Sequence, residues 1–406
     1  MTSIVASIFI WSTFGASAFV SVMFLVNLLF FRKATVPISR NALASGSARQ
    51  PDASASRLIE NGDRSGICVS VLIPARNEAL RIGRLLDSVL ASDGVTCDVC
   101  VLDDESQDGT TAIVENYSSH HPNVRLLRGV SKPSGWSGKQ WACYQLAQQA
   151  KFDELVFLDA DVALSKDALL RAVTQRQTFR VDLLSGFPHQ QVVTLGEQLM
   201  IPLIQLILLC FLPFGLMRWT RMTGASAGCG QFFLTTKAAY HSTGGHGSIR
   251  QSLHDGVMLP RSYRLAGFRT DLFDASDIAS CRMYTSFGET WSGLMKNATE
   301  GFAKMPLLPV MTVLMLLAFV LPIVCVMGIL TGLIGPHFVA PVLSSCLMSY
   351  LPRFVCCLKF DRAWRACLLH PVSIILFLII QWSALIAKSR GKGVEWRQRS
   401  YEIAPS

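Results

Sequence analysis

The sequence predicts an α/β domain with a mostly parallel sheet, held in a membrane by apolar helices near both ends of the chain. Three observations predict this class. Long uncharged segments stand near the start and towards the end of the 406-residue chain. Charged residues make up only 16% of it, against roughly 25% in typical soluble proteins. Between the apolar segments, residues 67–187 alternate between short apolar runs and stretches with helical periodicity.

The composition excludes several classes of protein. Half of the residues are hydrophobic, which is incompatible with a disordered chain, and the sequence has no collagen repeat. The formal net charge of +9 would suit nucleic acid, but the Lys and Arg residues stand beside apolar segments rather than on one polar face, so we predict no nucleic-acid partner. The 12 cysteines lack a paired zinc spacing and are interpreted as reduced apolar residues.

The first apolar segment covers residues 4–31 and contains no charged residue. A membrane-spanning helix needs about 20 such residues. A signal peptide is disfavoured, because the run is too long and no cationic side chain precedes it. Arg32 and Lys33 follow at once, so the positive-inside rule places the N-terminus outside the cell and the following chain in the cytoplasm. We predict an anchor at 1–31 and a linker at 32–66.

Residues 306–388 form a second apolar region, for which we predict two or three helices. The candidate segments are 307–334, 339–358 and 367–387. A basic tail at 389–406 follows. If the tail is cytoplasmic like the middle of the chain, an even number of these segments must cross the membrane. Either one segment does not cross or the tail lies outside. The segment interrupted by Arg353 is the weakest candidate for a crossing helix.

A shorter uncharged segment, residues 201–217, lies inside the predicted soluble domain of residues 67–305. It is slightly too short for a full span and contains Pro202 and Pro213. We predict that it is an interfacial helix that could admit an apolar molecule from the membrane. The alternative is a packed core helix.

The middle of the chain is predicted to alternate strand and helix. The expected strands are residues 67–73, 99–102, 124–127, 155–158 and 183–187. The expected helices are residues 79–90, 110–117, 140–150 and 165–173. Ligands of such domains bind beyond the carboxyl ends of the strands. There is no G-x-G-x-x-G or Walker A motif, so dinucleotide-binding and P-loop proteins are disfavoured.

Carboxylates follow two of the predicted strands. Asp103 and Asp104 end the second strand, and Asp159 and Asp161 follow the fourth. An Asp-x-Asp at a strand end can direct oxygen ligands at Mg²⁺ or Mn²⁺, a cation that is often shared with substrate phosphates. The other pair can accept hydrogen bonds from a ribose or a base. The alternative is that each pair is simply a turn, but their common position after apolar strands favours a binding site.

Four segments together resemble family-2 glycosyltransferases with the GT-A fold. They are VLIPARNE at 71–78, DDESQDGT at 103–110, WSGK at 136–139 and LDAD at 158–161. The resemblance covers about residues 67–305. More narrowly, the N-terminal anchor, the segment GQF at 230–232 and the segment GGH at 244–246 resemble carotenoid-acid (diaponeurosporenoate-type) and hopene-associated glycosyltransferases.

The resemblance implies a role for each matching residue. Nucleotide-sugar binding is implied for Pro74, Arg76, Glu78, Asp103, Asp104, Lys139, Asp159 and Arg282. A divalent cation would be held by Asp161 together with Asp159. Asp255 falls at the position of the catalytic base, where a helix cap or a surface acid is the alternative. His254 replaces the family's usual acid, and Arg282 has a lipid-headgroup arginine as its alternative.

The implied enzyme is a hexosyltransferase of the cell membrane, inner or plasma, multi-pass and with its catalytic domain in the cytoplasm. It would move a sugar, in the first instance from a UDP-sugar, to a hydroxyl or carboxyl of a carotenoid- or hopanoid-type lipid. The family implies inversion and a Mg²⁺ or Mn²⁺ cofactor. The Q-x-x-R-W motif of polysaccharide synthases is missing. The alternatives are a polyprenyl-phosphate sugar synthase and a non-catalytic membrane scaffold.

Four histidines could suggest another metal site. They are His189, His241, His246 and His254. Their spacing matches no common pair of metal ligands, so we interpret them as ordinary hydrogen-bonded or exposed histidines.

Overall fold

The computed structural model describes residues 2–35, 66–301, 303–390, 394–396 and 399–401, so most of the predicted linker and part of the basic tail lie outside the described residues. The chain divides into two compact units. The sheet unit comprises Arg32–His189 and Met217–Cys281. The helical unit comprises Met1–Phe31, Gln190–Leu216 and Arg282–Ser406. The division differs from the predicted domain of residues 67–305, because 190–216 and 282–305 belong to the helical unit.

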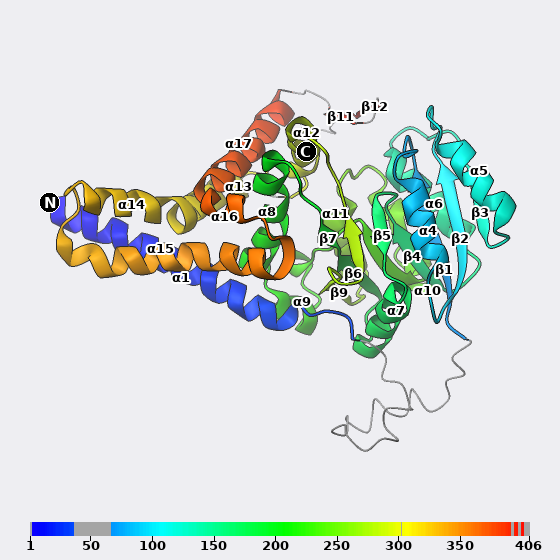
Figure 1. The fold of residues 1–406 in the computed structure, drawn as a ribbon, viewed down its shortest axis with the longest axis horizontal. Helices are drawn as coiled ribbons and strands as arrows, with labels where there is room; N and C mark the ends of the chain where they lie inside the picture. Colours follow the sequence, from blue (N-terminus) through cyan, green and yellow to red (C-terminus); the bar gives the residue numbers. More distant parts are fainter. Residues whose placement is uncertain (1, 36–65, 302, 391–393, 397–398, 402–406) are drawn as a thin grey trace, which may run out of the picture. The chain divides into compact units, whose positions relative to one another are not determined.

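The sheet unit is built on a seven-stranded sheet of described residues, in the order β3-β2-β1-β4-β8-β6-β9 (Figure 1). The strands are β1 (Cys68–Ala75), β2 (Thr96–Asp103), β3 (Val124–Arg128), β4 (Glu154–Leu158), β6 (Leu183–Phe187), β8 (Phe232–Thr236) and β9 (Thr270–Asp274). β8 is antiparallel to both β4 and β6, and the other pairings are parallel. The predicted mostly parallel sheet is confirmed, and each of the five predicted strands has a counterpart.

Helices of the sheet unit follow the predicted alternation. They are α4 (Ile82–Leu90), α5 (Thr110–His120), α6 (Gly138–Gln148), α7 (Ala168–Phe179), α10 (Lys237–Ser242) and α11 (Asp255–Leu265). Short 3₁₀ turns lie at η1 (Thr223–Ala225) and η2 (Gly245–Ile249). A small second sheet has the order β5 (Val162–Leu164), β10 (Ala279–Cys281), β7 (His189–Gln190). The boundaries between the two units fall after Phe31, within β7, within α9 (Phe214–Trp219) and after β10. In α4 the buried residues share one face of the helix, and they are Ile82, Leu85, Leu86 and Val89.

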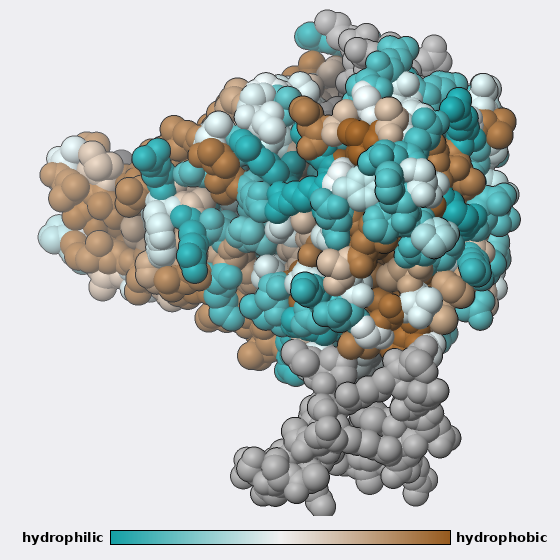
Figure 2. All heavy atoms as spheres, turned by 45° about the vertical axis from the view of Figure 1, so that its right-hand side comes forward, coloured by the Kyte–Doolittle hydropathy of each residue, from teal (hydrophilic) through white to brown (hydrophobic). Residues whose placement is uncertain are grey.

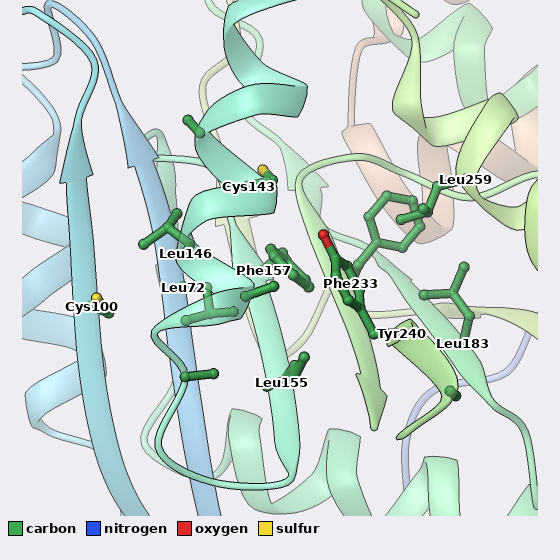
Figure 3. Close-up of a cluster of buried hydrophobic side chains, with 14 of the residues drawn as sticks. Leu72, Cys100, Cys143, Leu146, Leu155, Phe157, Leu183, Phe233, Tyr240 and Leu259 are labelled. Carbon is green, nitrogen blue, oxygen red and sulfur yellow. The ribbon is translucent and has the colours of Figure 1, made fainter. Parts of the chain in front are cut away.

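A hydrophobic cluster fixes the strands and helices that carry the site (Figure 3). Leu72, Phe157 and Phe233 contribute from β1, β4 and β8, and Leu146 contributes from α6. Tyr240 lies beside Phe157, with ring centroids 5.5 Å apart. Because these side chains are buried and closely packed, the loops at the ends of their elements are held in fixed positions.

The helical unit contains long apolar helices. Its elements are α1 (Thr2–Phe30), α8 (Leu195–Phe211), α12 (Phe287–Ala298), α13 (Leu307–Met315), η3 (Leu316–Val320), α14 (Leu321–Leu330), η4 (Pro336–Phe338), α15 (Val339–Cys356), η5 (Cys357–Asp361), α16 (Trp364–Leu368) and α17 (His370–Ser389), followed by the strand pair β11 (Val394–Trp396) and β12 (Arg399–Tyr401). Both η3 and η5 are π-helical turns. Four helices of the described residues are long and apolar enough to cross a membrane. They are Ile4–Phe30, Leu307–Leu330, Pro336–Asp361 and His370–Ser389.

The direction of these helices follows from their contacts. Ile10 near the start of α1, Cys325 in α14 and Phe338 at the start of α15 share one cluster. At the opposite end, the ring of Phe31 lies 5.8 Å from that of Phe360 in η5. Thus α1 and α15 run in the same direction, and α13–α14 runs against them, whereas α17 crosses obliquely (Figure 1). The segment with Arg353 was the weakest candidate for a crossing helix in the sequence analysis. In the structure it forms α15, which lies alongside α1.

Apolar side chains cover much of the exposed surface of the helical unit. Figure 2 shows them concentrated where α1 begins and α14 and α15 meet. Several are large and more than 40% exposed, including Ile8, Trp11, Val324 and Leu347. A surface of this composition is unusual for a protein in water and typical of one in contact with lipid.

Polar side chains join α1 to the rest of the helical unit. The hydroxyl of Ser17 donates a hydrogen bond to the Ala318 carbonyl in η3 (2.9 Å). Ser21 donates in the same way to Met348 of α15. Near the end of α1, the Asn27 amide donates to the carbonyls of Leu209 and Leu212, after the last turn of α8. Bonds of this kind hold bundles of apolar helices together, so α1 is an integral part of the helical unit.

The segment predicted to be interfacial corresponds largely to α8, which lies in the helical unit. Most of its side chains are buried, and it contacts α1, α12, α15, α16 and α17. A helix covered by protein on most sides has no wide apolar face to lay on a membrane. The packed-core alternative therefore describes α8 better than the interfacial prediction does.

Candidate active site

The loops after β1 and β2 are held together by hydrogen bonds from the side chains of the DDESQDGT segment. Glu78 N donates to Thr110 Oγ1 at 2.7 Å, and Ala79 N donates to Asp108 Oδ2 at 3.0 Å. In return, Gln107 N donates to Asn77 Oδ1 at 2.8 Å. Asn77 and Glu105 both have left-handed backbones, with φ of +53° and +58°, which is costly for residues with a Cβ. Much of this motif therefore shapes the loop.

The predicted nucleotide residues lie at this edge of the sheet. Both carboxylate oxygens of Asp103 accept hydrogen bonds from their own segment, from Ser106 N (3.2 Å) and Thr111 Oγ1 (2.7 Å). Arg76 donates to the backbone carbonyl of Asp104 and lies 3.6 Å from Glu105. Pro74, in β1, is next to the last strand residues of β2. The carboxylate of Asp103 thus stabilises the loop that follows β2. The predicted contacts of Arg76 and Asp104 with a nucleotide remain predictions.

Lys139 is the centre of the site. Ser137 caps α6 by accepting a hydrogen bond from Gln140 N, which sets Lys139 in the first turn of the helix. Its Nζ lies 2.6 Å from Asp159 Oδ1 and 2.9 Å from Asp255 Oδ2. It also donates to the Gly230 carbonyl at 3.2 Å. One ammonium group therefore joins the end of β4, the start of α11 and the segment before β8.

The ionisation of this cluster follows from burial and from the three charges. Burial opposes the charged form of Lys139, but the carboxylates of Asp159 and Asp255 outweigh it and raise its pKa well above the usual value. For Asp159, burial outweighs the ammonium group and raises the pKa. For Asp255, burial is outweighed by Lys139, so its pKa falls below the ordinary value. Asp255 is therefore ionised at neutral pH and is a weak proton acceptor.

Asp161 has the features expected of a metal ligand. Burial, followed by the negative charges of Asp159 and Glu78, raises its pKa to about 7. Its Oδ1 is buried and has no hydrogen-bond partner among the described residues, while the carboxyl group is hydrogen-bonded to the thiol of Cys281 on β10. A buried carboxylate with an unused oxygen suits a hard divalent cation.

The site would still need ligands from outside the protein. No group of three or more His, Cys, Asp or Glu side chains in the described residues could hold a metal ion. Asp161 and Asp159 would therefore share the cation with the oxygens of a bound diphosphate, as Mg²⁺ sites commonly do. The residues present fit that arrangement.

Asp255 lies in the first turn of α11, and its role as a catalytic base stays a prediction. It is the first residue of α11 and only 7% exposed, so it is not a surface acid. Its Oδ1 accepts a hydrogen bond from Gly256 N at 2.9 Å. The positive end of the helix favours an ionised carboxylate at this position. His254 precedes it and would lower the pKa of Asp255 further when protonated.

One of the four histidines packs behind the site. His246 is buried, its Nδ1 lies 2.9 Å from Tyr240 Oη, and its ring lies 4.7 Å from that of Phe157. Burial lowers the pKa of His246 to about 3, so the ring is neutral. The interpretation of His246 as an ordinary hydrogen-bonded histidine is confirmed.

Two residues near the predicted metal ligands were missed by the sequence analysis. The amide of Gln231 donates to Cys281 Sγ at 2.7 Å, and that thiol is hydrogen-bonded to Asp161. Gln231 lies in the GQF segment, for which the resemblance implied no role of a single residue, and Cys281 belongs to no motif. Only the pairing of Cys281 with Val162 across β10 and β5 brings the thiol to the carboxylate.

Arg282 belongs to the helical unit, as the residue that follows β10. Its guanidinium lies 3.6 Å from the buried Glu197 of α8. Glu197 also completes a capping box with Thr194 at the start of that helix. The predicted role of Arg282 on a leaving diphosphate stays a prediction.

Comparison with known proteins assigns a family to one segment of the chain. Residues 70–204, from β1 into α8, match the family described as glycosyl transferase family 2. The chain carries a family 2 glycosyltransferase domain. It is therefore a transferase enzyme by class, as the sequence predicted.

Relatives of this glycosyltransferase extend the match beyond that domain. The chain is 27% identical to the 4,4'-diaponeurosporenoate glycosyltransferase of Staphylococcus aureus strain USA300, over 347 residues that cover 83% of this chain and 88% of that protein. The protein of the same name from strain MRSA252 matches equally well.

Two solved structures are also similar in part. A mannosyltransferase from Pyrobaculum calidifontis, in complex with GDP-Man and Mn²⁺, is 15% identical with a TM-score of 0.42, covering 84% of this chain and 92% of that one. TarS from S. aureus, in complex with UDP-GlcNAc, is 14% identical with a TM-score of 0.38, covering 84% and 98%.

Replacing Gly230 by alanine is expected to displace Asp255. A Cβ at Gly230 would stand 2.1 Å from Asp255 Oδ1, too close for both to stay in place. A shift of about 1 Å in a catalytic group can cost about 100-fold in rate. If Asp255 is the base, we therefore expect Gly230→Ala to lower sugar transfer to a hydroxyl-bearing acceptor to about that extent. The measurement is kcat of the purified protein.

The control for this variant is Gly224→Ala, because a Cβ there meets nothing within 4 Å. It should keep the wild-type rate, and both variants should keep the wild-type unfolding temperature to within a few degrees. If a folded Gly230→Ala protein transfers sugar at the wild-type rate, the rate does not depend on where the Asp255 carboxylate lies, and the prediction is wrong.

Proposed function

We propose that this glycosyltransferase is membrane-bound and moves a sugar from a nucleoside-diphosphate sugar, in the first instance a UDP-sugar, to a carboxyl or hydroxyl of a lipid, with inversion. The observation that carries the proposal is the cluster in which Lys139 joins Asp159 to Asp255, beside the unused oxygen of Asp161. The cluster combines a site for a cation and a diphosphate with an ionised carboxylate. The names of the 27% identical relatives support a carotenoid acid as the acceptor.

The donor would lie across the ends of β1, β2 and β4. Asp104 and Arg76 would contact the nucleoside, on a loop that Asp103 and Asp108 hold in shape. A divalent cation bound by Asp161 and Asp159 would supply positive charge to the diphosphate oxygens. The ammonium group of Lys139 is close enough to Asp159 to add to that charge.

The transfer would proceed by direct displacement. An acceptor oxygen attacks the anomeric carbon and forms the new C–O bond, while the bond to the diphosphate breaks and the nucleoside diphosphate leaves with its electron pair. If the acceptor is a hydroxyl, its proton passes to Asp255. If the acceptor is a carboxylate, it is already ionised at neutral pH and has no proton to lose. The lowered pKa of Asp255 suits the second case better.

We also propose an orientation in the cell membrane. Arg32 and Lys33 follow α1, so the end of α1 faces the cytoplasm. The chain then crosses outwards in α13–α14 and returns in α15, and the oblique α17 stays near the cytoplasmic face. Two C-terminal spans of this kind leave both the sheet unit and the tail in the cytoplasm, which satisfies the parity requirement.

Binding of the donor should depend on a divalent cation and on Asp161. In the purified full chain we expect UDP-glucose or UDP-GlcNAc to bind more tightly with Mn²⁺ than without it. We expect Asp161→Asn to weaken binding in Mn²⁺ at least about tenfold, because it removes a charged ligand from the cation. Titration calorimetry measures both affinities, with GDP-mannose as a further donor.

Asp93→Asn is the matched control for this experiment, because Asp93 is an exposed acid of the same unit. It should bind the donor like the wild type. If folded wild-type protein binds none of the nucleotide sugars, the proposed donor site is wrong and the scaffold alternative is favoured.

The acceptor class should be visible in the effect of Asp255→Asn. With a hydroxyl-bearing lipid, loss of the base should lower kcat at least about 100-fold. With a carotenoid carboxylic acid, the same variant should lose less than about tenfold, because no proton is transferred. Radiolabelled transfer to each lipid, and to a polyprenyl phosphate, measures the difference. Equal losses for acid and alcohol would contradict the mechanism, and transfer to the phosphate alone would favour the sugar-phosphate synthase.

Reporter fusions test the orientation. Alkaline phosphatase, which is active only outside the cytoplasm, should be inactive when fused after Ser389 and active when inserted near Gly332, between α14 and α15. Green fluorescent protein fused after Ser389 should fluoresce. An active phosphatase after Ser389 would show that α17 crosses the membrane.

A further inference from the structure

The end of α15 and the start of α17 bury polar groups that form no hydrogen bonds. Arg353 is 1% exposed, and His370 and Ser373 are 0% exposed. One nitrogen of Arg353, Nη1, donates to Asp361 Oδ2 at 2.8 Å. Its Nε and Nη2, both ring nitrogens of His370 and the hydroxyl of Ser373 have no hydrogen-bond partner in the described part of the chain. Nothing in the proposed transfer reaction uses these groups.

These side chains lie where the end of α15, η3 and the start of α17 come together. Tyr350 stands one turn before Arg353 on α15, and its ring lies 5.8 Å from that of His370. The ring of Phe319, in η3, lies 5.1 Å from His370 on another side. Ser373 follows His370 one turn later on the same helix. The cluster is therefore centred on the N-terminus of α17.

That N-terminus is itself a favourable place for an anion. α17 is 20 residues long, and its N-cap residue, Leu369, makes no side-chain capping bond. Pro371 in its first turn has no N–H, so the helix dipole and the remaining N–H groups are what an anion would meet. The first backbone N–H groups of a helix and its dipole attract negative charge. The two π-helical turns, η3 and η5, supply Phe319 and Asp361 to the cluster, and such turns are often found at functional sites.

The unused groups are almost all donors, and this defines the chemistry of an occupant. A guanidinium group has five N–H donors and no acceptor. Asp361 uses one nitrogen and offsets the charge, and the remaining donors face a buried region where unmade hydrogen bonds are costly. A carboxylate or phosphate offers several acceptor oxygens in the planar arrangement that arginine binds best.

The surroundings of the cluster indicate how such an anion would arrive. Phe354 and Leu358 on the α15 side, and Trp364 and Leu369 before α17, are 39–57% exposed. An oxyanion that reaches Arg353 past these side chains would carry an apolar tail. We propose that the helical unit has a lipid-binding site here, in which Arg353, His370, Ser373 and the N-terminus of α17 hold the carboxylate or phosphate headgroup of a lipid.

This site does not depend on the identity of the sugar or on the donor site. Two sources of the headgroup share the required chemistry. One is the phosphate of an anionic membrane lipid, and the other is the carboxylate of a long-chain acid such as an acceptor. The experiment below tests an anionic membrane lipid and a long-chain acid separately.

The test uses the purified full chain in a neutral detergent. Affinity is measured by native mass spectrometry and by the shift of the unfolding temperature. Phosphatidylglycerol is compared with phosphatidylcholine, and a C30 carotenoid acid with its methyl ester. We expect at least one anionic lipid to bind tenfold more tightly than its neutral counterpart. The arm that responds identifies the source.

Two variants connect that preference to the cluster. The double variant Arg353→Gln/Asp361→Asn removes both charges, so that neither is left unpaired, and should abolish the preference for the anion while donor binding is unchanged. Ser373→Ala leaves the ion pair intact and should weaken anion binding about fivefold, the value of one ordinary hydrogen bond. It keeps the proposal testable if the double variant does not fold.

Arg365→Gln is the matched control, since Arg365 is an exposed cation on the neighbouring α16. It should keep the wild-type preference. The proposal is overturned if wild-type protein binds anionic and neutral lipids equally, which would mean that the cluster holds ordered water only. It is also overturned if Arg365→Gln loses as much preference as the cluster variants, which would indicate general attraction to a basic surface.

Discussion

The candidate active site depends on one ion-pair network, in which the ammonium group of Lys139 lies between the carboxylates of Asp159 and Asp255. Without that cation, two acids would share a partly buried space, and like charges so close together raise each other's pKa. The three residues come from the start of α6, the end of β4 and the start of α11. The buried cluster around Leu72, Phe157 and Leu146 keeps these three ends in register. The packing of the sheet unit thus sets the protonation state of the site.

Much of the sheet unit could be predicted, because apolar runs of strand length alternate with amphipathic stretches and end in polar residues. The same pattern placed Asp103 and Asp159 at strand ends. It did not identify β8 as an antiparallel insertion between β4 and β6, since an apolar run carries no information about direction. The meeting of Lys139 with Asp255 was also hidden, because only the folded sheet brings these distant segments together. Cys281 beside Asp161 is a second such contact.

The helical unit was predicted less well, and for a physical reason. Length and hydropathy identify a helix that can leave water, but they do not tell whether lipid or protein covers it. α8 has the composition of an interfacial helix and is covered by other helices. α1 has the composition of a plain anchor, yet its polar residues Ser17, Ser21 and Asn27 bond to neighbouring backbones. The sequence does show these three polar residues within the uncharged run. They could have indicated that α1 packs against other helices, because a polar side chain in a membrane helix usually faces a partner.

The network around Lys139 also bears on the choice of acceptor. The ammonium group that lies beside Asp255 lowers the pKa of that carboxyl group, so the interaction that would position Asp255 as a base would also weaken it. An enzyme that acts on a hydroxyl would gain from releasing Asp255 from Lys139 once the donor is bound, because a base is most effective when its pKa lies near the working pH. An enzyme that acts on a carboxylate needs no such release. It can keep the ion pair throughout the reaction, with Asp255 holding Lys139 near the departing diphosphate. An ion pair that persists through the reaction is therefore compatible with an acceptor that is already ionised.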